Sequence, residues 1–211
     1  RANIGIRRRL APLLDNDRNQ IELFNALLLS LPGSPIIYYG DEIGMGDNIW
    51  LDDRDGVRTP MQWDGSKNAG FSDADTLYAP VIDDETFSYR QVNVEQQMAE
   101  PTSLWHTLHR MLMLRKQYRA FGRGSFSFML PDNETVLGYW RVYAGEEDGA
   151  AAERFLVLVN LTESPQEAGL DLAEFAGHHP VDILSGREWA TITEDCYRVE
   201  LAAYAYHWLK F

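Results

Sequence analysis

The sequence predicts an α/β segment followed by an all-β domain. Two observations lead to this fold class. A helical pattern feeds a short apolar strand in the first part of the chain, and apolar and polar residues alternate with a period of two after residue 122. The composition changes at the same point, so we place the domain boundary between residues 1–122 and residues 123–211.

A helix followed by a buried strand is expected near the beginning. Asp15-Asn16-Asp17 offers side-chain acceptors for the free N–H groups of a helix start, and Pro32-Gly33 ends the helix. Residues 35–40 form a short apolar run between turn-forming residues, which predicts a strand buried on both faces, as in a parallel sheet covered by helices. The apolar face of the helix comprises Ile21, Phe24, Leu27, Leu28 and Leu31.

The segment from residue 41 to about residue 100 shows no sustained periodicity. A stretch of about 60 such residues exceeds ordinary loop lengths and predicts a functional loop. A second helix is expected from Pro101-Thr102-Ser103 to Gly122. Its apolar face comprises Leu104, Leu108, Met111 and Leu112.

Short strands separated by polar turns predict an antiparallel β-sandwich of about 90 residues in the last part of the chain. The strands are expected at residues 125–130, 135–143, 155–161, 181–184, 197–201 and 204–211. Residues 146–153 are interpreted as a polar hairpin loop.

Charge and cysteine content argue against several partners and sites. Lys and Arg number 19 and Asp and Glu 32, and the net charge of −13 disfavours nucleic acid and anionic membranes. The local exception, Arg7-Arg8-Arg9, is interpreted as a solvated helix face. Cys196 is the only cysteine, which excludes an internal disulfide and a cysteine-based zinc site. No apolar run approaches the roughly 20 residues that span a bilayer.

Carboxylates follow directly after the predicted strand, where ligands bind in parallel α/β folds. Asp41 and Glu42 therefore have two interpretations. They act as acid, base or sugar ligand, or they brace the glycine-rich turn by accepting hydrogen bonds from its N–H groups. The bracing role is slightly favoured, because one carboxylate pair in a loop is a weak signal.

The segment from Asp52 to Trp63 carries further binding chemistry. A guanidinium suits vicinal hydroxyls or a carboxylate, and Trp63 can stack on the C–H face of a sugar ring. Oxygen-bearing side chains of this region could instead gather calcium, but their spacing misses the EF-hand pattern, and a solvated acidic loop is favoured. These residues are Asp47, Asn48, Asp52, Asp53 and Asp55.

Three segments carry a family resemblance. Residues 5–14 read Gly-Ile-Arg-Arg-Arg-Leu-Ala-Pro-Leu-Leu, residues 31–48 read Leu-Pro-Gly-Ser-Pro-Ile-Ile-Tyr-Tyr-Gly-Asp-Glu-Ile-Gly-Met-Gly-Asp-Asn, and residues 55–63 read Asp-Gly-Val-Arg-Thr-Pro-Met-Gln-Trp. Together they resemble the trehalose synthases, a branch of the α-amylase superfamily (glycoside hydrolase family 13). The resemblance implies that residues 1–122 are the C-terminal end of a (β/α)8 TIM barrel, with its last helix–strand–helix and a long βα loop. Residues 123–211 would be the C-terminal β-sandwich.

The resemblance also implies binding roles. Arg58 matches an arginine that in the family lies near the pocket for the nonreducing glucose, and Arg54 is the second candidate. Glu42 matches the motif of the eighth barrel strand, which shapes the pocket floor. The aromatic content of the loop, rather than the resemblance, suggests three further residues around the acceptor side: Phe71, Tyr78 and Tyr89.

No catalytic residue is assigned to this chain. The family's nucleophilic Asp, acid/base Glu and stabilising Asp follow the fourth, fifth and seventh barrel strands, which are expected upstream of Arg1. A retaining mechanism needs its carboxylate pair. We therefore expect these 211 residues alone to be inactive.

The implied activity is intramolecular transglucosylation that interconverts maltose and trehalose by a retaining mechanism. Two alternatives stay open: an oligo-1,6-glucosidase-type α-glucosidase, and a noncatalytic carbohydrate-binding or assembly module. No cofactor or metal is expected in this chain, and calcium remains an option for the intact enzyme. The resemblance implies a cytoplasmic location. A lone helix–strand–helix exposes strand edges and apolar helix faces, so the expected partner is the N-terminal part of the barrel or a second copy of the chain.

Overall fold

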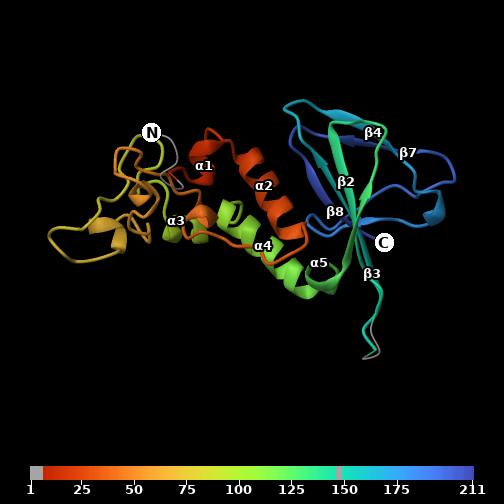
Figure 1. Cartoon of the computed structure of the whole chain (residues 1–211), viewed down its shortest axis with the longest axis horizontal. Helices are drawn as coiled ribbons and strands as arrows, with labels where there is room; N and C mark the ends of the chain where they lie inside the picture. Colours follow the sequence, from red (N-terminus) through yellow and green to blue (C-terminus); the bar gives the residue numbers. More distant parts are fainter. Residues whose placement is uncertain (1–6, 146–148) are drawn as a thin grey trace. The chain divides into compact units, whose positions relative to one another are not determined.

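A computed structural model describes residues 7–145 and 149–211, and the chain forms two compact units (Figure 1). The first unit comprises Arg1–Glu22 and Ile36–His109, and the second comprises Leu23–Pro35 and Arg110–Phe211. Two helices, α2 (Arg18–Ser30) and α4 (Leu104–Gln117), contribute residues to both units.

The start of α2 follows the sequence prediction. Oδ1 of Asp17 accepts hydrogen bonds from the backbone N–H groups of Asn19 at 2.9 Å and Gln20 at 3.1 Å. These bonds satisfy free donors of the first turn. The helix ends before Gly33, whose φ of 105° suits a residue without a side chain. A short helix, α1 (Leu10–Leu13), precedes α2, and the two helices join α4 in a small core of Ala11, Ile21, Leu104 and Leu108.

The apolar face predicted for α2 is wrong in part. Ile21 is buried, but Phe24 is 45% exposed and Leu28 is 39% exposed. The helix instead buries a neighbouring face that includes Leu23 and Leu29. The expectation that the apolar faces of both helices are exposed therefore holds in part for α2. It does not hold for α4, where Leu104, Leu108 and Met111 are buried.

The strand predicted at residues 35–40 is not formed in the part of the chain that the structure describes. Among the described residues no strand pairs with this segment, and Ile36 is 85% exposed. A central parallel strand is defined by hydrogen bonds to strands on both sides. Because no such neighbouring strands are present, the segment forms no strand hydrogen bonds. It therefore stays exposed, although its apolar sequence predicts burial.

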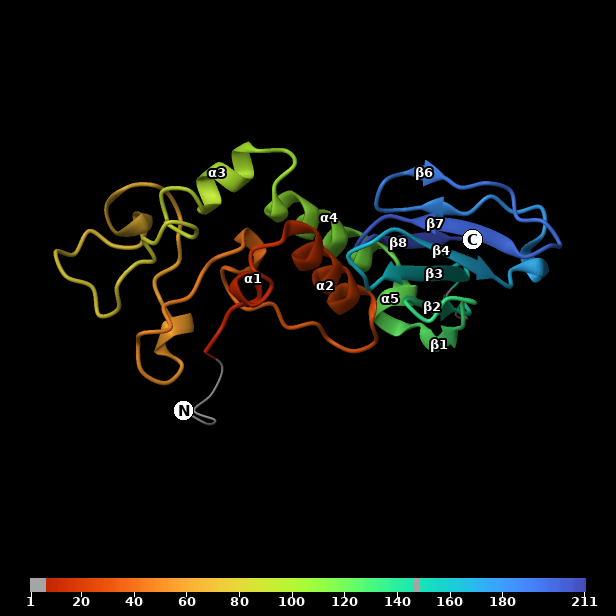
Figure 2. The same ribbon diagram turned by 90° about the horizontal axis from the view of Figure 1, so that it is seen from above.

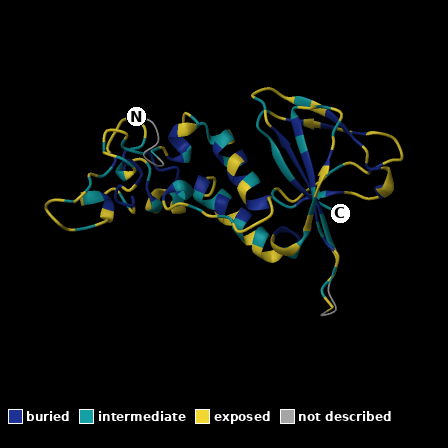
Figure 3. Cartoon of the chain, in the orientation of Figure 1, coloured by how far each residue is buried: buried dark blue, intermediate teal, exposed yellow. Residues whose placement is uncertain are grey.

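The long loop lacks regular structure over most of its length, as predicted, and much of it is exposed (Figure 3). It contains three short 3-10 helices, η1 (Asp41–Ile43), η2 (Asp55–Val57) and η3 (Lys67–Gly70). It also contains one helix that the sequence analysis missed, α3 (Val94–Ala99), which Asn93 caps by accepting a hydrogen bond from the N–H of Gln96 at 2.8 Å.

The second predicted helix is interrupted. After α4, Tyr118 takes an extended backbone conformation, and α5 (Arg119–Arg123) follows. The end lies at Gly124 rather than Gly122, and Gly124 has an extended backbone conformation. A Cβ at Gly124 would stand 2.4 Å from the carbonyl oxygen of Ala120 and 2.7 Å from that of Val142. The backbone therefore packs too closely there for any other residue.

Antiparallel sheets form the second unit, as predicted. One sheet has six strands in the order β1-β2-β3-β8-β5-β6, and the other pairs β4 with β7 (Figure 2). The strands are β1 (Ser125–Met129), β2 (Val136–Tyr143), β3 (Glu153–Asn160), β4 (Gln166–Leu170), β5 (Val181–Asp182), β6 (Arg187–Glu188), β7 (Tyr197–Leu201) and β8 (Tyr206–Lys210). Neither β4 nor β6 was expected from the sequence. The residues 146–148 of the predicted hairpin loop lie outside the described residues.

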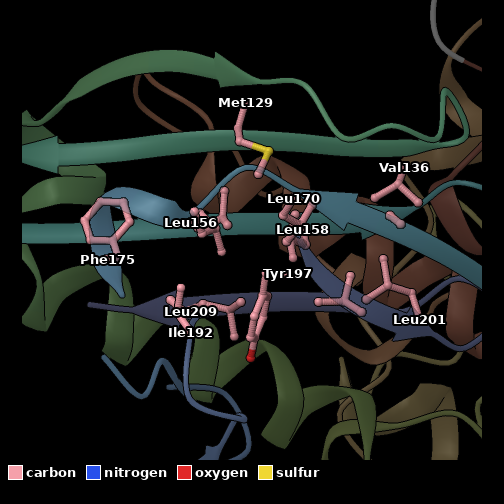
Figure 4. Packing of buried hydrophobic residues seen from close by; sticks show 13 residues of the cluster. Met129, Val136, Leu156, Leu158, Leu170, Phe175, Ile192, Tyr197, Leu201 and Leu209 are labelled. Atoms are coloured by element: carbon pink, nitrogen blue, oxygen red, sulfur yellow. The ribbon is translucent and has the colours of Figure 1, made fainter. Parts of the chain in front are cut away.

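The core of this unit lies between the two sheets. Side chains from β1, β2, β3, β4, β7 and β8 meet there, including Leu156, Leu170 and Tyr197 (Figure 4). The middle strand β3 is buried on both faces, because its other face packs under α5, where the rings of Phe121 and Phe155 lie 4.9 Å apart. No helix in the described part of the chain is long and apolar enough to cross a membrane.

Candidate functional site

The loop that carries Arg54 and Arg58 is fixed through its backbone. Asn48 donates its N–H to the carbonyl oxygen of Gly56 at 2.9 Å, and a Cβ at Gly56 would stand 2.2 Å from the carbonyl oxygen of Asn48. Only glycine permits this approach. Further along, the buried Gln62 side chain donates to the carbonyl oxygens of Phe87 and Val92.

Arg9 anchors the same loop from a distant part of the chain. Its side chain is 0% exposed, and it donates to the carbonyl oxygens of Tyr39 at 2.5 Å and Val57 at 2.8 Å. Arg8 pairs with Asp47 at 3.0 Å. The interpretation of the arginine run as a solvated helix face is therefore wrong, since these guanidinium groups bind loop carbonyls and a carboxylate.

Two hollows adjoin this loop within the first unit. The aromatic hollow, with a volume of about 420 Å³, is lined by Tyr39, Glu42, Arg58, Thr59, Pro60, Met61, Trp63, Phe71, Tyr78 and Ala79. The arginine hollow, with a volume of about 520 Å³, is lined by Arg8, Arg9, Leu10, Ile36, Tyr38, Asp41, Arg54, Val57 and Arg58. Arg58 lines both.

The structure brings some of the predicted site residues together. Glu42 and Arg58 line the aromatic hollow, and Arg54 lies with Arg58 at the arginine hollow. Arg58 is half-exposed, and its ion pair with Asp55 spans 3.9 Å. The guanidinium is therefore open to a stronger acceptor.

The predicted aromatic enclosure is present in part. Phe71 and Tyr78 line the aromatic hollow together with Trp63, and all three side chains are exposed. Tyr89 is not part of it, because its ring is buried and lies against the Arg90 guanidinium. Exposed aromatic rings beside an arginine are typical of surfaces that bind sugars through ring stacking and hydrogen bonds.

The carboxyls after residue 40 do not brace the turn in the predicted way. Asp41 lies 3.6 Å from the Arg9 guanidinium, and burial raises the pKa of Asp41 from 3.8 to about 6, against the lowering effect of Arg9 and with a further rise from Glu42. One buried oxygen of Asp41 and one of Glu42 find no hydrogen-bond partner among residues 7–145 and 149–211. Buried polar atoms usually have a partner, so these two oxygens are available acceptors at the edge of the hollows.

The acidic residues considered for calcium are otherwise engaged. Asp53 pairs with Arg54 and Asp55 with Arg58, and Asp47 accepts from Arg8. No three His, Cys, Asp or Glu side chains within residues 7–145 and 149–211 are placed to hold a metal ion. Calcium in a longer protein stays a prediction.

Two residues of the site were missed in the sequence analysis. Arg9 and Tyr39 hold the backbone on either side of Arg58, since the Tyr39 hydroxyl donates to the carbonyl oxygen of Thr59 at 2.8 Å. The sequence alone does not identify Arg9 as a buried residue, because nothing distinguishes it from the two arginines that precede it.

Comparison with known families supports a single assignment. Residues 7–124 match the model of the alpha-amylase catalytic domain, and residues 126–208 match the C-terminal domain of maltogenic amylase. The chain belongs to the alpha-amylase family. This alpha-amylase family chain is 50% identical over its whole length to a trehalose synthase from Pimelobacter sp., of which it spans 36%.

Other relatives carry different names. The amino acid transporter heavy chain SLC3A1 of Rattus norvegicus is 38% identical to this chain. The match covers 68% of this chain and 21% of the transporter heavy chain. A crystal structure of trehalose-6-phosphate hydrolase from Bacillus licheniformis matches the fold with a TM-score of 0.73 at 23% identity, over 100% of this chain and 42% of that one. The chain thus spans about a third of the trehalose synthase that it matches.

Proposed function

We propose that this chain is part of a trehalose synthase, and that the whole enzyme interconverts maltose and trehalose by intramolecular transglucosylation with retention. The 50% identity to a trehalose synthase along the whole chain carries the proposal. In this reaction the α-1,4 bond of maltose breaks, and the glucosyl group passes to an enzyme carboxylate. The acid/base group gives its proton to the departing C4 oxygen in this first step. The C1 hydroxyl of the released glucose then attacks the glucosyl carbon to form the α,α-1,1 bond, the bond to the carboxylate breaks, and the hydroxyl proton passes back to the acid/base group.

The first unit supplies part of the sugar pocket in this proposal. Arg58 binds a hydroxyl or a carboxylate at the nonreducing glucose, Arg54 assists, and Glu42 shapes the floor. The open position of Arg58 between two hollows supports this assignment. The catalytic carboxylates are supplied by the rest of the enzyme, and a closed pocket keeps water from the glucosyl intermediate.

The proposed architecture follows the same reasoning. Residues 1–122 represent the end of a (β/α)8 barrel, in which the segment 35–40 is the eighth strand and gains its neighbours from the rest of the barrel. The exposed, unpaired state of this segment supports that view. Residues 123–211 are the C-terminal sandwich, and the enzyme is placed in the cytoplasm.

The first test feeds maltose to the full-length protein and identifies the products by chromatography. Trehalose with a little glucose supports the proposal, and residues 1–211 alone, assayed in parallel, are expected to form neither. Glucose as the only product favours the α-glucosidase alternative. Calcium dependence is checked in the same assay by adding and removing a chelator.

A noncatalytic module is the second candidate, because one relative is named as a transporter heavy chain. In that case the full-length protein binds maltose or α-glucan without converting it, or serves only in assembly. Binding measured by calorimetry together with an absence of products would favour this alternative. The proposed partners of the chain are the remaining part of the barrel and the two disaccharides, with no nucleic acid and no membrane.

A further inference from the structure

The orientation of Arg58 depends on its backbone. Its side chain is 54% exposed, and its ion pair with Asp55 is long and open to water. Exposed ion pairs of this kind contribute little to fixing a side chain. The direction in which the guanidinium leaves the loop is therefore set by the peptide groups on either side of Arg58.

Two side chains hold the backbone close to Arg58, one at the peptide group before it and one at the peptide group that follows Thr59. The Arg9 guanidinium donates to the carbonyl oxygen of Val57 at 2.8 Å, and the Tyr39 hydroxyl donates to the carbonyl oxygen of Thr59 at 2.8 Å. The Tyr39 hydroxyl also lies 3.4 Å from the Val57 oxygen. Both bonds cross long stretches of sequence. They join the loop to Arg9, directly before α1, and to Tyr39, in the segment that follows α2.

Arg9 and Tyr39 support each other. The Arg9 guanidinium carbon lies 4.7 Å from the Tyr39 ring centroid and 5.0 Å from that of Tyr38, and its Nη1 donates to the Tyr39 carbonyl oxygen at 2.5 Å. Gly40 makes room for this arrangement, because a Cβ there would stand 3.2 Å from Nη1 of Arg9 and 2.6 Å from Sδ of Met45. The Arg9 guanidinium therefore holds the Tyr39 ring and backbone in place, and the Tyr39 hydroxyl in turn holds the loop at Thr59.

We propose that Arg9 and Tyr39 are positioning residues that hold the Arg58 backbone so that its guanidinium faces the bound sugar. This inference rests on the proposed function, in which Arg58 contacts the substrate. Neither residue needs to touch the reacting bond. The effect of each on catalysis passes through Arg58, and this property separates the proposal from a general contribution to folding.

The test is a double-mutant cycle in the full-length protein. Tyr39→Phe removes the hydroxyl but keeps the ring under Arg9, and it is combined with Arg58→Ala. We expect Tyr39→Phe to raise the KM for maltose about 5-fold, the loss of one hydrogen bond, with a much smaller change in kcat. In the Arg58→Ala background the same substitution is expected to leave KM unchanged. Equal effects in both backgrounds, or no effect on KM in the first, would overturn the proposal.

The matched control is Tyr197→Phe. It removes another tyrosine hydroxyl that donates to a carbonyl oxygen at 2.8 Å, that of Ala190 in the sandwich. We expect this variant to keep the wild-type KM. A second variant, Arg9→Lys, retains the charge but loses the two-pronged donor, and it is expected to raise KM in the same Arg58-dependent way.

Hydrogen exchange gives a readout that does not depend on the reaction. Tyr39→Phe is expected to speed amide exchange in the peptide that covers residues 57–60 and to leave exchange in the sandwich unchanged. Unchanged exchange at residues 57–60 would contradict the positioning role even if the wild-type enzyme forms trehalose. If the wild type forms no trehalose, the proposed function fails, and the exchange result still decides whether Tyr39 holds the loop.

Discussion

The guanidinium of Arg141 donates a hydrogen bond of 2.8 Å to the carbonyl oxygen of Ser30, at the end of α2 and 111 residues away in sequence. The same side chain donates to the carbonyl oxygens of Ala120, Phe121 and Gly124. Arg141 is 1% exposed in the middle of β2. The last carbonyl groups of a helix have no hydrogen-bond donors within the helix. The buried Arg141 guanidinium supplies such donors to the C-terminal ends of both α2 and α5.

Replacement of Arg141 is expected to be strongly destabilising. Arg141→Met fills a similar volume but leaves several buried carbonyl oxygens without donors, so we expect a loss of about 3 kcal/mol or more in the free energy of unfolding. Urea denaturation followed by circular dichroism measures this. Arg198→Met is the control, since Arg198 forms an exposed ion pair with Asp132 and its loss should cost less than about 1 kcal/mol. Equal costs for the two variants would contradict the account.

Two neighbouring glycines are expected to respond in opposite ways. Gly124→Ala places a Cβ against the backbone of Ala120 and Val142, so we expect a destabilisation of about 2 kcal/mol. Gly122→Ala meets no atom within 4 Å inside α5, and the higher helix propensity of alanine should stabilise the protein by about 0.5 kcal/mol. Thermal denaturation of both variants measures these changes. A melting temperature of Gly124→Ala equal to that of the wild type would refute the predicted close packing at Gly124.

Burial makes Asp41 sensitive to pH. Its pKa is raised from 3.8 to about 6, so its contribution to stability is complete below pH 3.8 and is lost as the pH rises through about 6. Relative to Asp41→Asn, the wild type should lose about 2 kcal/mol of unfolding free energy between pH 4 and pH 7. Denaturation curves across this range test it, and parallel pH profiles for the two proteins would count against the buried carboxyl.

Arg58 is expected to act in substrate binding. In the full-length protein, Arg58→Ala should raise the KM for maltose by about 10-fold or more, the loss of a charge-assisted hydrogen bond. Steady-state kinetics with Arg90→Ala as a control measure this, because Arg90 pairs with Asp83 outside both hollows. A KM that stays at the wild-type value in Arg58→Ala would remove Arg58 from the site.

Local patterns predicted the starts of α2 and α4 and most strands, because caps and alternation are properties of neighbouring residues. The Asp17 cap and the antiparallel strands of the sandwich are examples. Strand β4 was missed because Ala168, Gly169 and Leu170 are all buried and show no alternation. The strand predicted at residues 35–40 is absent for a different reason. A strand forms only when neighbouring strands accept and donate its hydrogen bonds, and the pattern of apolar residues does not show whether such strands are present.

The site was predictable only where a motif marked it. Glu42, Arg54 and Arg58 came from the resemblance, and the structure places them at adjoining hollows. Arg9 and Tyr39 were not found, because their roles depend on carbonyl oxygens of Val57 and Thr59, and backbone acceptors leave no trace in a sequence. Long-range contacts of this kind become visible only in the folded chain.

The most direct test of the proposed transglucosylation uses maltose and an excess of ¹³C-labelled glucose with the full-length protein, followed by NMR. We expect trehalose whose two glucose units are largely unlabelled, because the released glucose stays in the closed pocket and reacts there. Formation of glucose alone, with no trehalose at any time, would contradict the account.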